Sequence, residues 1–205
     1  SMVDERERVT IEEYCDDVAP PSALHRDAMA NLAFDHPAFM EAHRIARMGG
    51  DARLSPSERL MFYPHINIAG IQSGYTGAGF QSSIPNTAFA KLDLHFVANQ
   101  DPDRCLDLLR RHIRSHCPDE VEVVRGGSMP PSRTPIDHPA VPVVFEALKA
   151  VWGEDPVIVP LLGGGLPDHL FTGLLRLPSL WVPFAQPDQA NHAPNENIMA
   201  GHFLK

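Results

Sequence analysis

The stretch IPNTAFAKLDLHFV, residues 84–97, decides the fold. Its second half alternates between apolar and polar residues, which is the pattern of a β-strand with one face buried and one face open. The apolar face carries Leu92, Leu94 and Phe96, and the polar face carries Lys91, Asp93 and His95. The stretch therefore predicts a strand in a two-sided sheet.

The flanking residues extend this strand into a larger unit. HINIAGI (65–71) predicts a second strand, and the glycine-rich SGYTGAGF (73–80) predicts the connecting loop. Asp101 and Pro102 are typical of a helix start, and the face expected from the helical period carries Cys105, Leu108, Leu109, His112, Ile113 and His116. VTIEEY (9–14) and VEVV (121–124) predict further strands. Together these elements predict an α+β region, a split β-α-β pattern with an antiparallel sheet, lacking its first strand and helix.

Short helices are expected between residues 22 and 59, with one restarting at Ser55 and Pro56. After residue 127 the pattern changes to a helix over 140–152, a buried strand VIVPLL (157–162), a helix near 168–175 and a second buried strand SLWVPF (179–184). This alternation predicts an α/β portion. Two strands are too few to bury both faces of a sheet, so we expect the remaining strands upstream or in another chain. The predicted domains are residues 1–127 and 128–205.

Composition excludes several classes of protein. The 205 residues are 43% hydrophobic and 21% charged, which is typical of a globular protein. A net charge of −9 without basic clusters argues against nucleic acid. No apolar stretch approaches the roughly 20 residues of a membrane span, and the first residues do not form a signal peptide, so we expect a cytoplasmic protein. Three cysteines without CxxC spacing indicate neither a disulfide framework nor a cysteine zinc site.

The strongest local feature is the polar loop DQANHAPNEN (188–197), which directly follows the strand predicted at 179–184. Ligands bind at such positions in α/β sheets. His192 could bind a metal while Asn195 or Glu196 holds its other ring nitrogen, although a lone histidine in a loop is more often structural. The backbone N–H groups of the GGGLP turn (163–167) could bind a carboxylate. Alternatively, the glycines simply allow a helix and a strand to pack closely. His112 and His116 lack the HExxH order and are expected at the core boundary.

In order along the chain, several segments resemble the di-zinc peptidases and deacylases that include carnosinase, aminoacylase, acetylornithine deacetylase and glutamate carboxypeptidase. The segments are YCDDVAPPS (14–22), residues 54–102, the His138-Pro139 pair before a helix, PLLGGGLPD (160–168) and DQANHAPNENI (188–198). The resemblance implies a metal-dependent hydrolase of amide or peptide bonds in small substrates such as dipeptides or N-acyl amino acids. It also implies an α+β lid or dimerisation domain over residues 1–127, followed over residues 128–205 by the C-terminal α/β portion of the catalytic domain. In the intact enzyme it implies two zinc ions and a homodimer formed through the lid domain.

Within this resemblance, residue roles transfer position by position. His192 matches the family's last zinc ligand. Ser82 matches a position that holds substrate, and His95 matches one where relatives commonly have an arginine that grips the substrate carboxylate. A histidine cannot offer the same bidentate contact. The remaining substrate positions are Gly164 and Gly165, which match a Gly-Ser turn, and Arg125, which falls near a lid contact of carnosinase-like enzymes.

Other family motifs find no match in the chain. These are the HxD ligand pair, the Glu-Glu that contains the general base, and the lid histidine. The resemblance implies that zinc-activated water attacks the amide with the help of that glutamate. Because these motifs have no match here, we expect a fragment of the enzyme, consistent with the abrupt Ser1-Met2 start. The alternative is a dimerisation or binding module without catalysis. An acyltransfer enzyme is less favoured, because the chain has no GxSxG motif.

Overall fold

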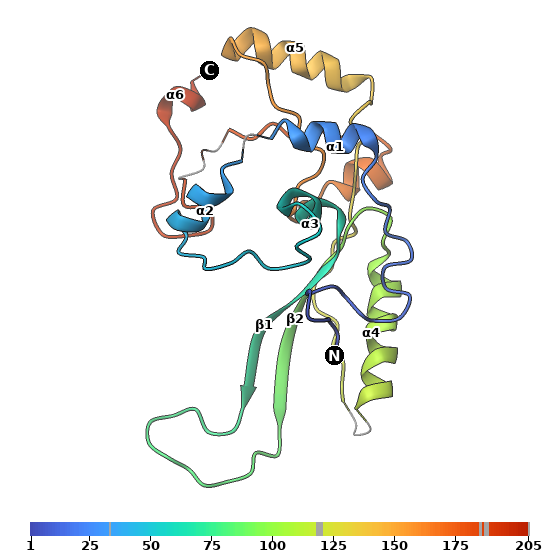
Figure 1. The fold of residues 1–205 in the computed structure, drawn as a ribbon, viewed down its shortest axis with the longest axis vertical. Helices are drawn as coiled ribbons and strands as arrows, with labels where there is room; N and C mark the ends of the chain where they lie inside the picture. The colour runs from blue at the N-terminus through green and yellow to red at the C-terminus, as the bar shows by residue number, and fades with distance from the viewer. Residues whose placement is uncertain (33, 118–120, 185, 187–188, 205) are drawn as a thin grey trace.

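The computed structural model describes residues 1–32, 34–117, 121–184, 186 and 189–204 (Figure 1). In chain order its elements are α1 (Ala23–Ala30), α2 (His36–Ala42), α3 (Pro56–Phe62), β1 (His65–Ser73), β2 (Ala88–His95), α4 (Pro102–His116), α5 (Ala140–Trp152), a π-helix η1 (Leu170–Leu174) and α6 (Ala200–Phe203). None of the helices in this part of the chain is long and apolar enough to cross a membrane.

β1 and β2 form an antiparallel hairpin that projects from the rest of the molecule (Figure 1). His65 lies opposite His95 at the base, and Ser73 lies opposite Ala88 near the loop. The register shifts between Ile68 and Gly70, and such a bulge inserts one extra residue into one strand. Ile71 therefore lies on the same face as Ile68, although their odd spacing would otherwise place them on opposite faces.

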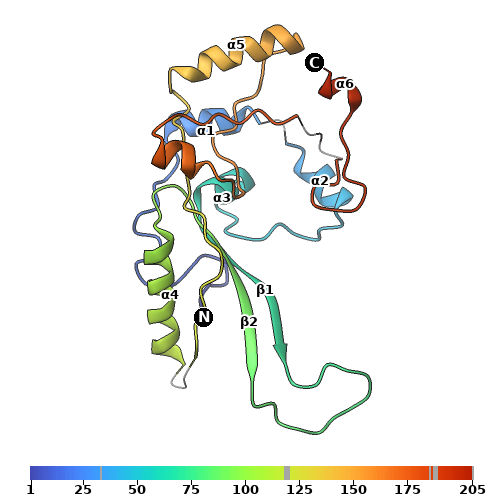
Figure 2. The ribbon, with the colours of Figure 1, turned by 180° about the vertical axis from the view of Figure 1, so that it is seen from behind.

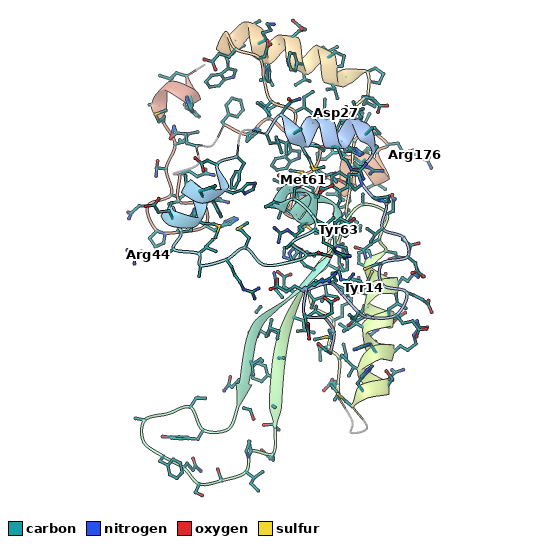
Figure 3. The ribbon with its side chains drawn as sticks, in the orientation of Figure 1. Tyr14, Asp27, Arg44, Met61, Tyr63 and Arg176 are labelled. Carbon is teal, nitrogen blue, oxygen red and sulfur yellow. The ribbon has the colours of Figure 1, made fainter. Side chains whose placement is uncertain are left out.

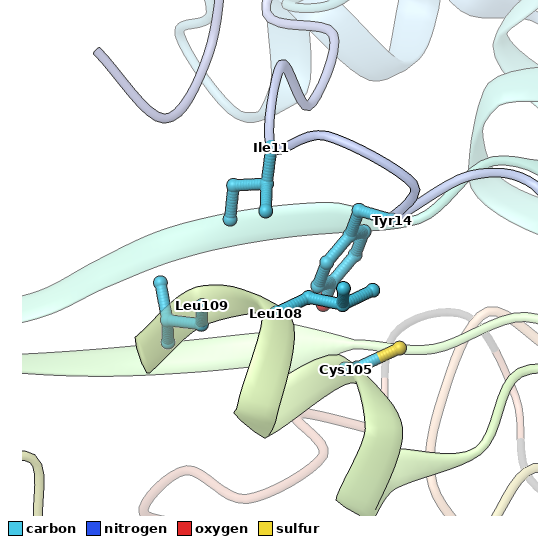
Figure 4. Close-up of a cluster of buried hydrophobic side chains, with 5 residues drawn as sticks. All are labelled: Ile11, Tyr14, Cys105, Leu108 and Leu109. Atoms are coloured by element: carbon cyan, nitrogen blue, oxygen red, sulfur yellow. The ribbon is translucent and has the colours of Figure 1, made fainter. Parts of the chain in front are cut away.

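α4 packs against one face of this hairpin and forms the main core (Figure 4). The Asp101 side chain accepts a hydrogen bond from the Asp103 backbone N–H, and Pro102 occupies the first turn, where its missing N–H has no cost. The buried residues are Ile11, Tyr14, Cys105, Leu108 and Leu109, and Leu92, Leu94 and Phe96 pack against them. The predicted apolar face of β2 and the predicted helix start are thus confirmed.

A second, smaller core joins α1 to α3. It consists of Met29, Met61 and Phe62, with Leu161 packed against it from the C-terminal region. Both helices begin with a capping box, from Ser22 in α1 and Ser55 in α3, which satisfies backbone N–H groups that a helix start leaves unpaired. Figure 3 shows Met61 and Tyr63 between the base of the hairpin and α1. Leu161 thus connects this core to the C-terminal third of the chain.

The structure corrects four strand predictions, because the described residues form no strand at 9–14, 121–124, 157–162 or 179–184. Residues 11–17 form turns, and near the N-terminus only an isolated bridge joins Val3 to Val9. The segments 157–162 and 179–184 form neither helix nor strand, and several of their apolar side chains, including Leu162 (61% exposed) and Trp181 (52%), reach solvent. An extended segment becomes a strand only when a neighbouring backbone pairs with it, and the described chain offers none here.

The helix predictions need smaller corrections. The helix expected near 168–175 is the shorter π-helix η1, which lies beside an indole hydrogen bond from Trp181 Nε1 to Asp168 Oδ1 at 2.8 Å. α1, α2 and α3 are the short helices expected between residues 22 and 59, and α2 ends at Ala42. α5 forms as predicted and is followed by the capping residue Gly153, whose φ of 78° suits glycine. Figure 2 shows α5 at the end of the molecule opposite the hairpin loop.

Candidate functional site

The polar face of the hairpin base carries a compact group of three polar side chains. The imidazole rings of His65 and His95 stack with centroids 4.1 Å apart and an interplanar angle of 14°. Nε2 of His95 lies 2.9 Å from Oδ2 of Asp93. Directly opposite residues of an antiparallel pair share one face of the sheet, so the hairpin register brings the two rings together. His95 is half-buried, with 34% of its side chain exposed, whereas Asp93 is exposed.

Burial lowers the pKa of His65, and the neighbouring His95 lowers it further. The Tyr63 backbone and Asp93 act in the opposite direction on the same pKa. The ring of His65 is therefore neutral more readily than a free histidine. Sequence reasoning singled out His95 but neither His65 nor Asp93 as part of a site. Counting the register back from the loop would have placed His65 opposite Phe96, because the bulge after Ile68 shifts the pairing by one residue.

Ser82 lies in the loop between β1 and β2, where it is exposed. Gly74 and Gly79 adopt positive φ angles there, and the Tyr75 hydroxyl donates a hydrogen bond to the Ala78 carbonyl at 2.8 Å. The loop forms the free end of the hairpin in Figure 1, on the side away from the helices. Ser82 thus lies in the loop that precedes β2, whereas His95 lies at the far end of β2, at the hairpin base.

Arg125 pairs with a carboxylate of its own chain. Its Nη1 lies 2.5 Å from Oδ1 of Asp103 in the first turn of α4, and both side chains are about half exposed or more. The contact ties the segment that returns after α4 to the start of that helix. In this arrangement the guanidinium is already engaged.

The glycine turn at 163–165 packs against two other segments. A Cβ at Gly163 would lie 2.3 Å from Cγ of Leu60 in α3, and one at Gly165 would lie 3.1 Å from Cε of Met129. At Gly164 the nearest atoms are at an ordinary 3.8 Å. Close packing therefore explains Gly163, while the two predicted substrate positions, Gly164 and Gly165, are exposed.

His192 is exposed and has a φ of 59°, a left-handed conformation that is uncommon for histidine. The surrounding turn is closed by backbone hydrogen bonds from Ala193 to Ala190 and from Asn197 to Gln189, both 2.9 Å long. Among the described residues, no hydrogen bond joins the His192 ring to Asn195 or Glu196, the partners proposed from the sequence. Asp188, at the start of the predicted loop, lies outside the described residues.

The predicted site residues do not converge within this chain. The hairpin loop is the lower end of Figure 1, whereas the segment after residue 189 runs beside α2 in the upper half. Throughout the part of the chain that the structure describes, no three His, Cys, Asp or Glu side chains are arranged to hold a metal ion. His192 alone therefore does not fit a complete metal centre. A cavity of about 530 Å³ between α1 and α5 is lined by residues that include Leu24, Asp27, Phe145 and Ile158, but by none of the predicted site residues.

His112 and His116 also stack, with ring centroids 4.1 Å apart. His112 is half-buried, whereas His116 is exposed at the end of α4. This agrees with a boundary position for His112, and places His116 outside the core.

Comparison with known proteins gives a consistent result over the whole chain. Residues 16–121 match the family model of the peptidase dimerisation domain. The chain is 21% identical over 213 residues to a Beta-Ala-His dipeptidase of Rattus norvegicus, a match that covers 100% of this chain and 43% of the relative. It is 22% identical over 220 residues to a Cys-Gly metallodipeptidase of Saccharomyces cerevisiae, covering 100% of this chain and 44% of that protein.

The solved structures that match include an M20 family metallo-carboxypeptidase from Sulfolobus solfataricus. Its TM-score is 0.90 at 30% identity, covering 98% of this chain and 46% of that one. The dipeptidase Dug1p from Saccharomyces cerevisiae shares the fold with a TM-score of 0.79 at 22% identity, covering 100% of this chain and 44% of that one. The chain thus spans less than half the length of the relatives it matches.

Proposed function

Because the chain belongs to the peptidase dimerisation domain family of the M20 peptidases, we propose that it is part of a metal-dependent hydrolase that cleaves amide or peptide bonds in small substrates. The observation that carries the proposal is the match over 98% of the chain to a metallo-carboxypeptidase at 30% identity and a TM-score of 0.90. A match this long covers the C-terminal third as well as the dimerisation domain. Residues 1–127 then form the lid or dimerisation domain and residues 128–205 part of the catalytic domain.

In this proposal the metal is zinc, two ions per active site, and His192 is the ligand that this chain contributes. Neutral imidazole is a common zinc ligand, and the exposed, strained turn around His192 leaves the ring open to a metal. The other ligands and the general base would come from outside these 205 residues. The substrate contacts are Ser82, His95, Arg125, Gly164 and Gly165.

The substrate class is a dipeptide or an N-acyl amino acid. The test measures hydrolysis of Cys-Gly, β-Ala-His and N-acetyl amino acids by the intact protein, after removal of metal and after addition of zinc. We expect activity only with metal, and we expect His192→Ala to reduce it at least about a hundredfold, as for loss of a metal ligand or its support. His116→Ala is the matched control, because His116 is also exposed but lies on α4. Full activity of His192→Ala would contradict the assignment.

We also propose that the domain forms a homodimer through the hairpin. Ile68 and Ile71 are 59% and 69% exposed on the same face of β1, and Phe80 and Ile84 are more than 90% exposed in the loop. Exposed apolar residues that share one face mark interaction surfaces. Light scattering of the 205-residue chain should give twice its 22.6 kDa mass, and Ile71→Asp should return it to the monomer. A monomer for the unmodified chain at micromolar concentration would contradict the dimer.

A second candidate is a dimerisation or binding module without catalysis. It is favoured by one observation, that the described residues bring no metal cluster together. The same measurements separate the two candidates, because the module predicts a dimer that neither binds stoichiometric zinc nor hydrolyses any of these substrates as the intact protein.

A further inference from the structure

The N-terminus of α1 is capped by an imidazole ring. In a capping box the third helical residue is normally Glu or Gln, whose side chain accepts a hydrogen bond from the backbone of the N-cap residue. In α1 that residue is His25, and the Ser22 backbone N–H donates to its Nδ1 at 3.1 Å. In return, the Ser22 hydroxyl oxygen accepts from the His25 backbone N–H at 3.3 Å. One half of this cap therefore depends on a titratable side chain.

This cap requires a neutral His25 ring whose proton lies on Nε2. The Ser22 N–H can donate only to a ring nitrogen that carries no proton of its own. A proton on Nδ1 would turn this nitrogen into a donor and leave the Ser22 N–H without its acceptor. It would also place a positive charge at the positive end of the helix dipole. The first turn of α1, which the structure describes in full, has no acidic residue to offset that charge.

The half-buried His25 ring joins α1 to two other parts of the chain. Its centroid lies 5.1 Å from that of Phe62, a buried residue of the second core, and the two rings are tilted by 53°. Residues 133–137, which lie between α4 and α5, line a cavity of about 160 Å³ together with Ser22 and His25. The cap, the second core and this returning segment thus meet at one side chain.

The charges around the ring favour its neutral form. Burial lowers the pKa of His25, Arg133 lowers it further, and Asp137 opposes them only in part. Arg26 of α1 and Glu58 of α3 pair with each other across the two helices, with 3.6 Å between Nε and Oε1. At neutral pH the ring is therefore uncharged and the cap is closed.

We infer that His25 is a pH-sensitive cap, which holds the N-terminus of α1 in place at neutral pH and releases it when the ring is protonated in acid. Figures 1 and 2 show α1 between α3 and α5, so an open cap loosens the connection between the second core and the C-terminal third of the chain. The protonated ring and Arg133 repel each other across the cavity, which adds to this loosening. The device lies outside the proposed metal and substrate residues.

Hydrogen exchange of the intact protein, measured by mass spectrometry on a peptide that contains α1, tests the cap. Conversion of the rates to protection factors removes the intrinsic pH dependence of exchange. The open cap binds a proton more tightly than the closed one, so protection should fall as the pH falls. We expect a fall of about fivefold from pH 7.5 to pH 5.5, the effect of losing an N-cap. Linkage limits it to about tenfold, because the ordinary histidine pKa is 6.5.

The matched control is His25→Gln, because glutamine completes a capping box without titrating. Its α1 protection should be equal at the two pH values. His25→Glu is the second choice should the first unfold, since its carboxyl group titrates below this pH range. His112→Gln removes another histidine whose pKa is lowered by burial, but it lies in α4 and should leave the pH dependence of α1 unchanged.

Two further variants test the connection to residues 133–137. Arg133→Gln should move the midpoint of the α1 transition to higher pH, because Arg133 lowers the pKa of His25. Asp137→Asn should move it to lower pH, because Asp137 raises that pKa. A midpoint that stays unchanged in both variants would overturn the connection of the cap to this segment. Equal α1 protection of the unmodified protein at pH 7.5 and 5.5, or a pH dependence that persists in His25→Gln, would overturn the cap itself.

Discussion

Replacing Leu109 by alanine tests whether the contact between α4 and the hairpin holds the domain together. Leu109 is 2% exposed and lies in the cluster with Ile11, Tyr14 and Leu108 (Figure 4). The substitution removes the γ carbon and both δ carbons. At about 0.8 kcal/mol for each buried CH₂ group the transfer term is about 2.4 kcal/mol. The cavity left behind raises the expected loss in unfolding free energy to about 3 kcal/mol.

Urea unfolding of the 205-residue chain, followed by circular dichroism, measures this loss. With a slope of about 2 kcal/mol/M the midpoint should fall by about 1.5 M. The matched control is Leu174→Ala, because Leu174 is 76% exposed in η1 and its substitution should change the unfolding free energy by less than about 0.5 kcal/mol. Equal midpoint shifts for the two variants would refute the idea that α4 is held by this cluster.

Three further predictions follow from close packing, thiol burial and histidine burial. Gly163→Ala should destabilise the chain by about 1–3 kcal/mol because the new methyl group meets Leu60. Gly164→Ala should cost less than about 1 kcal/mol. Thermal unfolding of both variants measures this difference in stability. Cys117 should react with a thiol reagent in the folded chain, whereas Cys105, which is buried and whose pKa is raised to about 11, should react only after unfolding. Mass spectrometry of the labelled chain measures which cysteine has reacted. Labelling of Cys105 in the folded chain would contradict its burial. The histidines whose pKa is lowered chiefly by burial are His25, His65 and His112. Since the unfolded chain binds more protons than the folded one near pH 6, stability should be complete above about pH 6.5 and fall as the pH drops below it; a urea midpoint that rises between pH 7.5 and 5.5 would show the opposite linkage.

Local signals were sufficient to predict much of the lid domain. The alternation at 91–96 gave both the strand and its buried face, and the Asp101-Pro102 pair gave the start of α4. These features depend on neighbours within a few residues. The strand predicted at 157–162 failed for the opposite reason, because an apolar run states that burial is favourable without stating which chain segment covers it. Val157, Val159 and Leu162 of this run remain more than half exposed in the described structure.

The candidate site was less accessible to sequence reasoning for a related reason. His95 could be singled out from its place in a motif, but the stacked partner His65 is 30 positions away in the printed sequence and becomes its neighbour only through the hairpin register. The ion pair of Arg125 with Asp103 likewise depends on how the chain returns along α4. The sequence shows the type of each polar residue, but it does not show which charged residue lies beside it in the fold.

The hairpin is held at one end only. At its base Leu92 and Leu94 pack against the main core, whereas the loop at its far end, which carries Ser82, is exposed. Thermal motion of such a hairpin grows with distance from its base. A ligand bound only at the tip must therefore order the loop, and the entropic cost of that ordering lowers its affinity. A second surface that holds the tip would remove this penalty in advance, and would tighten binding at Ser82 without touching the ligand.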